Sequence, residues 1–420
     1  MELRKLVEDE ARAARDALPH LTDVGVSEAL RGAAALVRER SASILKANSD
    51  DFAAASGRLD AGTLDRLRLD EARVEGLAIQ LESVASIAGL ERRGERWRQP
   101  DGLEVEERRI PIGVVGANFE ARPNVALDVA AQLLKSLNCA VLRTGGAALA
   151  TVTELVDEVV RPALAQAGLP PGAVGLVRSA EREGARLIAS MPELIPLVIL
   201  RGSGETTATL ARVAAEHGVR ALAHAEGGGV LYVHGSADPD KASKLVTDSL
   251  DRLGVCNRLN LLLIDRAAAA QAPSLVARVR ELDIDVRATA RAAALGLDAD
   301  PLDVPIGHEW ANDSDRVATI TIDLVDDLEE ATTIANEETS GLAAGIVAED
   351  AGAAERFLDA YRGTAAFWHA STRYTDGYAL TGAPETGINV DFSPGPRGPV
   401  TYRDLWLRQY RVTGDMSQQR

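Results

Sequence analysis

The sequence predicts an α/β fold with two parallel sheets and a small separate β flap, on the basis of three observations. From about residue 113 to residue 234, short apolar runs alternate with helical patterns, as they do when helices connect parallel strands. A second alternation of this kind runs from about residue 238 to residue 350. Residues 97–111 hold a Pro-Asp-Gly turn followed by apolar/polar alternation, which indicates a hairpin.

The remaining elements follow in order along the chain. Residues 1–95 are predicted to be helical, because apolar side chains recur at helical spacing, for example over residues 27–37. The first sheet is expected to contain strands at residues 112–116, 140–142, 174–177, 196–200, 221–223 and 230–233. The second unit is expected to carry a polar loop, a strand and a helix at residues 308–316, 317–322 and 328–338. Beyond Gly382, Gly and Pro give way to aromatic residues and Arg, which fits a terminal strand that pairs with the hairpin or with a neighbouring subunit.

The composition narrows the class of protein. A chain of 420 residues is long enough for two or three domains. Its net charge of −17, from 46 basic and 63 acidic residues, disfavours binding to nucleic acid or to an anionic membrane. Two cysteines do not imply a disulfide framework, and the charged first ten residues lack the apolar core of a signal peptide. We therefore expect a cytoplasmic protein.

Cys256 is the strongest candidate for a catalytic residue. It lies in Leu253-Gly-Val-Cys-Asn257, between a helix-like run and the apolar residues 261–264, where a side chain can project into a cleft. A thiolate at this position could attack an activated acyl carbon and form a thioester. The alternative is a buried structural cysteine, the commonest fate of a free thiol. Cys139 opens an apolar strand, and we expect it to pack in the core.

Residues 111–124 predict a strand, a loop rich in backbone donors and a helix opened by Pro123. Asn124, at the start of this helix, could donate its amide to an oxyanion or could cap the helix. Arg122 could pair with a phosphate or a carboxylate, or could form a surface salt bridge.

Three further polar runs follow predicted strands. One is expected to line a substrate cleft, although its two hydroxyls could instead cap a helix or loop: Ser371, Thr372 and Arg373. The other two follow strands of the first sheet, where backbone amides could receive a cofactor phosphate or ribose: Arg143, Gly145 and Gly146, and Arg201, Gly202, Ser203 and Gly204. A Gly-x-Gly-x-x-Gly fingerprint does not follow the first strand, so each run alone is weak evidence for a dinucleotide.

Several segments together resemble the glutamyl-phosphate reductase family, also called glutamate-5-semialdehyde dehydrogenase, of the aldehyde dehydrogenase superfamily. They occur in the family's order: Pro111-Ile-Gly-Val-Val-Gly116, Glu120-Ala-Arg-Pro-Asn-Val125, Leu134-Lys-Ser136, Val255-Cys-Asn257, Ala370-Ser-Thr-Arg-Tyr-Thr-Asp-Gly377 and Glu385-Thr-Gly-Ile388. The resemblance implies an aldehyde-dehydrogenase-like fold and reduction of L-glutamyl 5-phosphate to L-glutamate 5-semialdehyde, on the route to proline. It implies NADPH as cofactor, with NADH left open, and a thioester on Cys256. Asn124 would form the oxyanion hole with the backbone N–H of Cys256, and Asn257 would bind substrate.

The resemblance also divides the chain into domains. These are N-terminal helices at 1–95, an oligomerisation hairpin at 96–111, a dinucleotide-binding domain at 112–235, a catalytic domain at 236–365, a return to the cofactor domain at 366–381, and an oligomerisation strand and tail at 382–420. The family's hairpin reaches across a subunit interface, so we expect a homodimer or a higher homo-oligomer. Its aromatic anchors are expected to be Tyr402, Trp406 and Tyr410.

Departures from the family pattern keep two other functions open. Asn260 replaces an acid, Gly229 and Val230 stand where Cys and His are usual, and Leu342 stands where His is usual. These changes favour the same chemistry on a different acyl phosphate or thioester. The third possibility is a homologue that has lost catalytic activity and acts as a partner of an acyl kinase, such as glutamate kinase. Glu226 has no assigned role, and no metal site is expected because His224, His308 and His369 lack metal-ligand spacing.

Overall fold

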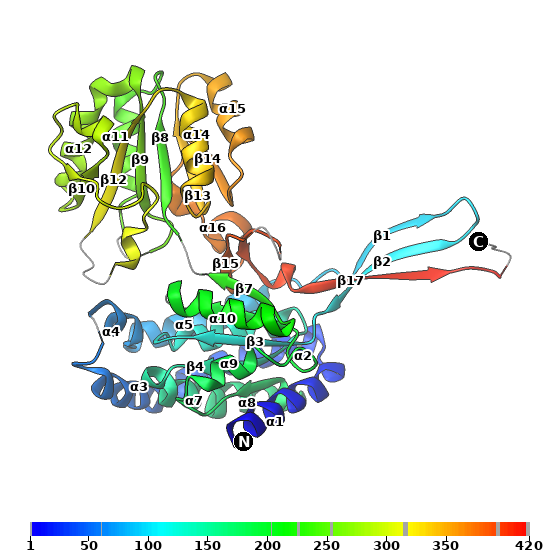
Figure 1. The fold of residues 1–420 in the computed structure, drawn as a ribbon. Coiled ribbons are helices and arrows are strands. Elements are labelled where there is room, and N and C mark those ends of the chain that lie inside the picture. The colour runs from blue at the N-terminus through cyan, green and yellow to red at the C-terminus, as the bar shows by residue number, and fades with distance from the viewer. Residues whose placement is uncertain are drawn as a thin grey trace. The chain divides into compact units, whose positions relative to one another are not determined.

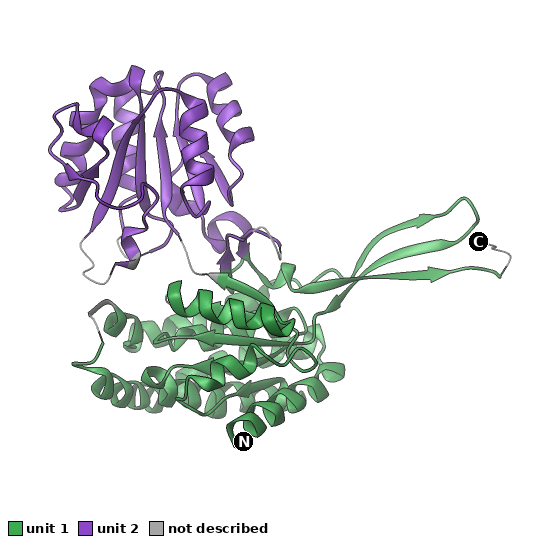
Figure 2. Cartoon of the chain, in the orientation of Figure 1, with its two compact units in different colours: residues 1–223, 383–387, 400–420 green, residues 224–382, 388–399 purple. Residues whose placement is uncertain are grey.

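The two predicted parallel sheets are both present, and each belongs to a different compact unit of the chain (Figure 2). The computed structural model describes residues 2–59, 61–202, 204–224, 227–252, 255–313, 318–391 and 395–416. Unit 1 comprises residues 1–223, 383–387 and 400–420, and unit 2 comprises residues 224–382 and 388–399. The α/β fold class predicted from the sequence is therefore confirmed.

Each of the N-terminal helices of unit 1 contributes apolar residues to the core of that unit. They are α1 (Glu2–Ala17), α2 (Asp23–Glu39), α3 (Ser41–Ala55), α4 (Ala61–Leu67) and α5 (Glu71–Ser86). In α2, the buried positions include Val26, Ala29, Leu30 and Ala33, a helical repeat that packs into the core of unit 1. The hydroxyl of Thr22 caps this helix by accepting a bond from Gly25 N at 3.1 Å.

The sheet of unit 1 has five strands in the order β5-β4-β3-β6-β7. Their bounds are β3 (Val114–Phe119), β4 (Cys139–Thr144), β5 (Val174–Leu176), β6 (Leu197–Arg201) and β7 (Arg220–His224). The pairs β3–β4, β3–β6 and β4–β5 are parallel. The helices in this part of the unit are α6 (Asn124–Lys135), α7 (Leu149–Glu154), α8 (Arg161–Gln166), α9 (Glu183–Ile188) and α10 (Gly204–His217).

The sheet of unit 2 has seven strands in the order β11-β10-β12-β9-β8-β13-β14 (Figure 1). These are β8 (Gly229–Val233), β9 (Leu259–Asp265), β10 (Asp285–Ala288), β11 (Asp300–Pro301), β12 (Thr319–Val325), β13 (Ala343–Val347) and β14 (Ala365–Trp368). Along β9, Leu262 and Ile264 pack on one face, whereas Leu261 and Leu263 pack on the other. Both faces are buried, which explains the continuous apolar run in the sequence.

Helices cover both faces of this second sheet. The face of Leu262 packs against α11 (Pro239–Asp248) and α12 (Ala272–Arg280). The face of Leu261 packs against α14 (Leu328–Glu337) and α15 (Ala351–Ala360). Two short helices, α13 (Ala290–Ala293) and α16 (Gly377–Thr381), complete the helices described for this unit.

Two segments lie in a different unit from the one expected. The strand at residues 230–233, expected in the first sheet, is part of β8 near the middle of the second sheet. Residues 366–381, expected to return to the cofactor domain, cluster with unit 2, where β14 pairs with β13. An apolar strand pattern reports burial but not the identity of the neighbouring strand, so the sequence alone did not specify these pairings.

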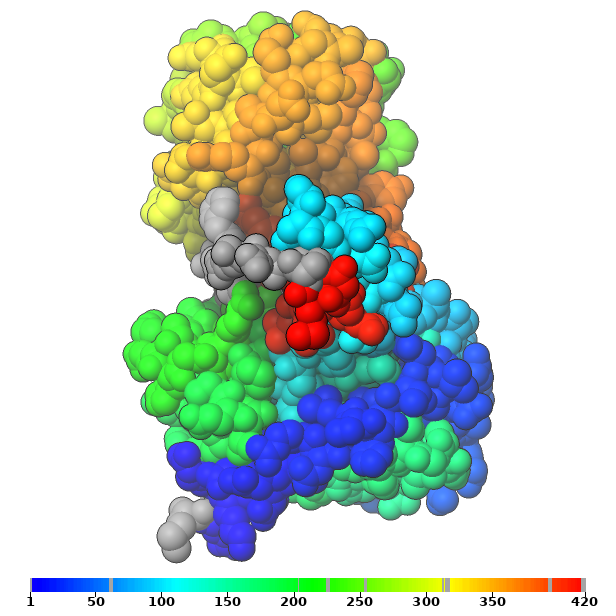
Figure 3. All heavy atoms as spheres, turned by 90° about the vertical axis from the view of Figure 1, so that its right-hand side faces the viewer, coloured from blue at the N-terminus to red at the C-terminus, as the bar shows by residue number. Residues whose placement is uncertain are grey.

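The predicted hairpin and the C-terminal strand form one antiparallel ribbon within unit 1 (Figure 1). The ribbon consists of β1 (Arg93–Arg98), β2 (Glu104–Pro111) and β17 (Trp406–Thr413). β17 pairs with β2 along its whole length, from Trp406 opposite Pro111 to Thr413 opposite Glu104. In the space-filling view, the red atoms of the C-terminal segment lie against the cyan atoms of the hairpin (Figure 3). The terminal strand therefore pairs with the hairpin of its own chain, one of the two alternatives that the tail suggested.

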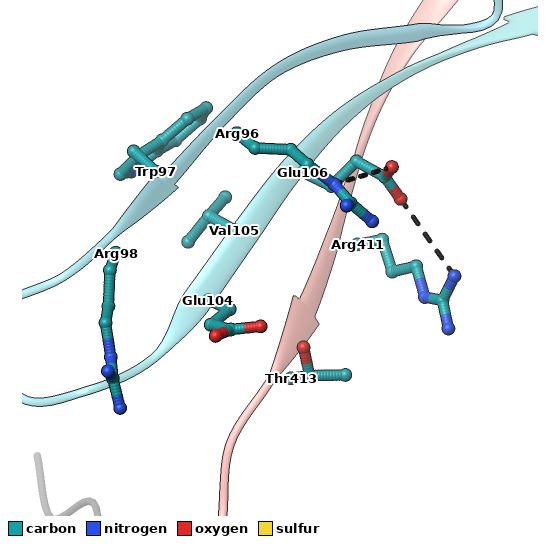
Figure 4. Close-up of a pocket in the computed structure, with 8 residues that line it drawn as sticks. All are labelled: Arg96, Trp97, Arg98, Glu104, Val105, Glu106, Arg411 and Thr413. Carbon is teal, nitrogen blue, oxygen red and sulfur yellow. Dashed lines mark hydrogen bonds and ion pairs between the residues drawn. The ribbon is translucent and has the colours of Figure 1, made fainter.

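Because side chains alternate along its strands, the ribbon has a charged face and an aromatic face, and Figure 4 shows the residues that line a groove on it. On one face Glu106 lies 3.0 Å from Arg96 and 4.0 Å from Arg411, along a groove of about 540 Å³. On the other face, the rings of Trp97 and Tyr410 meet edge to face at 5.9 Å. Both rings are exposed. A separate two-stranded sheet pairs β15 (Gly387–Asn389) with β16 (Gly398–Val400).

The length and composition of the helices bear on membrane insertion. Within the described residues, none of them combines the length and the apolar composition needed to cross a bilayer.

Candidate active site

Cys256 and Cys139 lie in contrasting surroundings. Cys256 is partly exposed and lies between α11 and β9 in unit 2. Cys139 is fully buried at the start of β4 in unit 1, and this burial raises the pKa of its thiol to about 12. A thiol with that pKa is almost entirely protonated near neutral pH, which makes it a poor nucleophile. Of the two cysteines, only Cys256 is accessible for chemistry.

Two glycines allow the backbone to approach the candidate nucleophile closely. Gly228 N donates to the carbonyl of Cys256 at 2.6 Å. A Cβ added at Gly227 would stand 2.5 Å from the Cβ of Cys256 and 2.7 Å from its carbonyl oxygen. Gly227 N in turn donates to Oε2 of Glu309 at 2.7 Å. The position of Cys256 therefore depends on the absence of a side chain at residue 227.

Asn257, the next residue of this loop, forms hydrogen bonds with residues 372–375. Its amide nitrogen donates to the carbonyls of Arg373 at 3.0 Å and Thr375 at 3.1 Å. Its own carbonyl accepts a bond from the hydroxyl of Thr372 at 2.9 Å. The guanidinium of Arg373 donates to Asn257 Oδ1 and pairs with Asp251 at 2.7 Å. These contacts bring residues 256–257 and 372–375 together, as the sequence motifs suggested. The resulting network of hydrogen bonds supports the loop that carries Cys256.

Ser371 and Thr372 are both buried, and their hydroxyls are engaged inside unit 2. Ser371 Oγ lies 2.9 Å from the hydroxyl of Ser249 and accepts a bond from Arg373 N at 3.1 Å, as a cap of the following turn. This geometry matches the capping alternative left open by the sequence. A Cβ at Gly229 would stand 2.5 Å from Thr372 Oγ1, so the glycine found there in place of the family's cysteine allows this close packing.

The other departures from the family pattern have separate structural roles. Asn260 donates to the carbonyl of His308 at 2.8 Å and accepts from Trp310 N at 3.2 Å, so it fastens residues 308–310 to β9. An acid at this position could not donate to the carbonyl unless it were protonated. Val230 is buried inside β8. Leu342 is fully buried in an apolar cluster with Phe367 and Ile388, against which Cys256 packs.

In unit 1, Asn124 begins α6 directly after a tight turn. Ala121 in that turn has φ of 46°, a left-handed conformation that costs a non-glycine residue about 1–3 kcal/mol and is typical of functional sites. Pro123 occupies the capping position, and the Asn124 amide donates forward along the helix, to Asp128 Oδ2 at 3.1 Å. The side chain therefore does not cap the helix. Arg122 is half-buried in the same turn, and its carbonyl accepts from Val125 N at 3.1 Å.

Asp128 has an unusual electrostatic environment. Burial raises the pKa of its carboxyl group to about 7, although the positive charge of Arg201 and the bond from Asn124 oppose this rise. The negative charge of Glu385 adds to the rise. A carboxyl group with a pKa this far from its ordinary range, next to a candidate oxyanion donor, is typical of a functional site. The sequence carried a signal for it, because residue 128 lies one helical turn after Asn124.

The predicted cofactor residues gather at one edge of the unit 1 sheet. Phe119 at the end of β3 pairs with Thr144 of β4 and with Arg201 of β6, so the residues after these strands emerge at the same edge. Arg143 is buried and donates to Asn118 Oδ1 at 3.2 Å and to the carbonyl of Glu181 at 3.0 Å. Burial lowers the pKa of its guanidinium.

At this edge, Gly145 leaves room for a ligand to approach the backbone. A Cβ added at Gly145 would meet no atom within 4 Å, whereas one at Gly146 would lie 3.2 Å from the Cβ of Ala180. Gly202 is exposed, and Gly204 begins the 14-residue helix α10, whose N-terminal N–H groups favour an anion. Ser203, like Glu226 and part of the turn before Cys256, lies outside the described residues. These features fit the phosphates of a dinucleotide.

Comparison with known proteins identifies the family. The aldehyde dehydrogenase family model matches residues 4–294. Gamma-glutamyl phosphate reductase of Zymomonas mobilis is 35% identical over 410 residues, covering 96% of this chain and 93% of the relative. The same enzyme of Methylocella silvestris is 35% identical over 413 residues, covering 97% of this chain and 94% of the relative.

Solved structures agree with this assignment. The crystal structure of gamma-glutamyl phosphate reductase from Thermotoga maritima has a TM-score of 0.93 at 26% identity, covering 99% of this chain and 100% of that one. An acetylating aldehyde dehydrogenase from Geobacillus thermoglucosidasius shares the fold, with a TM-score of 0.70 at 16% identity over 100% of this chain and 98% of that one. The chain therefore belongs to the aldehyde dehydrogenase family and, within it, to the gamma-glutamyl phosphate reductases, as its ordered motifs predicted.

Proposed function

We propose that this chain reduces L-glutamyl 5-phosphate to L-glutamate 5-semialdehyde through a thioester on Cys256, in proline biosynthesis. The observation that carries the proposal is the setting of Cys256. It is the accessible cysteine, on a loop held by Gly228 N and by the four hydrogen bonds of Asn257. Full-length relatives named gamma-glutamyl phosphate reductase support the choice of substrate.

The first step forms the thioester. The thiolate of Cys256 attacks the acyl carbon, a C–S bond forms, and the bond between that carbon and the phosphate oxygen breaks to release inorganic phosphate. Asn124 donates an amide N–H to the acyl oxygen as it gains negative charge, a contribution of about 3 kcal/mol for one such donor. Arg122 pairs with the phosphate or with the substrate carboxylate. No base that activates water is required, because phosphate leaves without hydrolysis.

The second step releases the aldehyde. A nicotinamide dinucleotide, when bound, supplies the hydride that reduces the thioester carbon. The C–S bond then breaks, Cys256 returns to the thiolate form, and the acyl oxygen becomes the aldehyde oxygen. Asn124 stabilises this oxygen while it carries negative charge. The hydrogen bonds around Asn257 keep the sulfur of Cys256 in place in both steps.

Two runs on unit 1 would hold the cofactor, with NADPH as our first choice and NADH as the alternative. The backbone after β4 and β6, together with the start of α10, provides N–H groups for its phosphates. The proposed residues are Arg143, Gly145, Gly146, Arg201, Gly202, Ser203 and Gly204. The buried hydrogen bonds of Arg143 suggest that it acts by fixing the neighbouring turn.

We further propose a cytoplasmic enzyme whose substrate is supplied by an acyl kinase.

We also propose that the ribbon formed by β1, β2 and β17 joins two copies of the chain. Trp97 and Tyr410 are exposed on one face of it, in a protein with only 4% aromatic residues. Exposed aromatic side chains of this kind favour burial at an interface. The opposite face carries the charged groups of Arg96, Glu106 and Arg411, which suit a polar rim.

A second candidate function is the same reaction on a different acyl group. Leu342 is the departure that favours it, because this side chain belongs to the apolar cluster against which Cys256 packs. A leucine in place of a histidine removes a hydrogen-bonding group and adds an apolar wall. The departures at Asn260 and Val230 give less support, since both side chains have structural roles within unit 2.

The test is the reverse reaction with L-glutamate 5-semialdehyde, inorganic phosphate and NADP⁺. We expect turnover by the wild-type chain and by the control variant Cys139→Ala, and less than about 1% of it in Cys256→Ala. Activity in Cys256→Ala would overturn the thioester mechanism. An aldehyde without the amino-acid group, tested alongside, separates the two candidate substrates. Preference for the simpler aldehyde would favour the second function.

A further inference from the structure

Asp128 makes a directed contact with the proposed oxyanion donor. The two residues lie one turn apart on α6, and Asn124 Nδ2 donates to Asp128 Oδ2 at 3.1 Å. Both side chains are half-buried, so bulk water does not freely replace either partner of this hydrogen bond. A bond between residues four positions apart on a helix restricts the rotation of both side chains.

The chemistry of the contact fixes which way the amide points. In the structure, Asn124 turns its NH₂ group, and not its oxygen, toward Asp128. The carboxylate form of Asp128, which predominates above a pH of about 7, can only accept this bond. One N–H of that NH₂ group is used in the bond, and a second N–H remains on the same nitrogen. Without Asp128, the amide could rotate by half a turn and present its carbonyl oxygen instead, which would repel a developing oxyanion.

The surroundings favour this role over a purely structural ion pair. The charged groups that act on Asp128 are Arg201, at the end of β6, and Glu385, in the 383–387 segment of unit 1. No salt bridge to Asp128 is found within the described residues, and its hydrogen-bonding partner there is the Asn124 amide. Burial of this carboxyl group raises its pKa to about 7, so the site keeps it at a cost in stability. Such costs persist at positions where they serve a function.

We infer that Asp128 is a positioning residue that holds the Asn124 carboxamide with an N–H directed to the acyl oxygen. This inference rests on the proposed function, since it acts through Asn124. It predicts that Asp128 contributes to the reaction only while Asn124 is present. A residue that merely stabilises α6 would contribute in either case.

The experiment is a double-mutant cycle with Asp128→Ala, Asn124→Ala and the double variant, followed by the reverse reaction. We expect Asn124→Ala to lower kcat by about 100- to 1000-fold, as loss of one oxyanion donor does. Asp128→Ala should lower kcat by about 10- to 100-fold with little change in KM, because the donor is present but misdirected. The double variant should match Asn124→Ala alone. Asp128→Asn, which keeps the size and an acceptor oxygen, should restore most of the activity.

The outcomes separate this inference from the proposed function. An additive loss in the double variant, or full activity in Asp128→Ala, would overturn the positioning role while leaving the thioester mechanism intact. Full activity in Asn124→Ala would remove the oxyanion donor itself, and with it both claims about α6. The rate at which iodoacetamide labels Cys256 serves as the folding control. This labelling rate should be unchanged in all four variants. A changed rate would mean that the loss of activity arises from the Cys256 loop in unit 2, and it would contradict the inference.

Discussion

The glycine beside the nucleophile offers a quantitative test of how Cys256 is positioned. In Gly227→Ala, the new Cβ would stand 2.5 Å from the Cβ of Cys256, where ordinary contacts begin at 3.4 Å. One of the two backbones must therefore move by roughly 1 Å. A displacement of about this size at a reacting group can cost about 100-fold in rate. The strain of overpacking should also cost about 1–3 kcal/mol in stability.

The assay measures kcat for the reverse reaction and the thermal midpoint of the same preparations. We expect Gly227→Ala to lose about 100-fold in kcat, and the rate of iodoacetamide labelling at Cys256 to change with it. Gly76→Ala is the matched control. Gly76 lies in α5 with no atom within 4 Å of an added Cβ, so alanine should stabilise the helix by about 0.5–1 kcal/mol without affecting activity. Wild-type kcat in Gly227→Ala would refute the reasoning, because it would mean that the loop carrying Cys256 accommodates the side chain freely.

Three further predictions concern the rest of the chain. Asn260→Asp removes the donor to the His308 carbonyl, so we expect unit 2 to lose about 1–3 kcal/mol in urea unfolding; unchanged stability would contradict this account of the departure. Replacing Trp97 and Tyr410 by Ser should shift the chain toward monomers in sedimentation, whereas a wild-type monomer at micromolar concentration would rule out the interface. The raised pKa of Asp128, about 7 against 3.8, means that ionising it in the folded state costs stability progressively as the pH rises from about 4 to 7. Asp128→Asn should therefore stabilise the chain more at pH 8 than at pH 5, by up to about 3 kcal/mol, and a pH-independent difference would refute the shift.

Elements with a strong local signal could be predicted from the sequence. The Pro-Asp-Gly turn and the alternation after it specify the hairpin of β1 and β2, because both depend on residues close in the chain. The apolar run at residues 261–264 specifies a strand buried on both faces, as β9 proves to be. The accessible thiol of Cys256 and the core position of Cys139 were likewise predicted from their neighbours in the sequence.

Features that depend on distant partners could not be predicted in the same way. The pairing of β8 with β9 and β13 is determined by the whole second sheet, so the strand at residues 230–233 was placed in the first. Tyr402 was expected to be an interface anchor, yet it is buried and donates to the carbonyl of Ala88, 314 positions away. The bonds of Asn260 to residues 308 and 310 have no local signature either.

The most direct test of the central claim is a single-turnover measurement without phosphate. When the enzyme is mixed with L-glutamate 5-semialdehyde and NADP⁺ alone, the thioester cannot be released by phosphate and should accumulate. We expect a burst of about one reduced cofactor per chain, with the acyl group found by mass spectrometry on the peptide that contains Cys256 and not on the one that contains Cys139. A burst with no adduct on Cys256, or a full burst in Cys256→Ala, would contradict covalent catalysis at this residue.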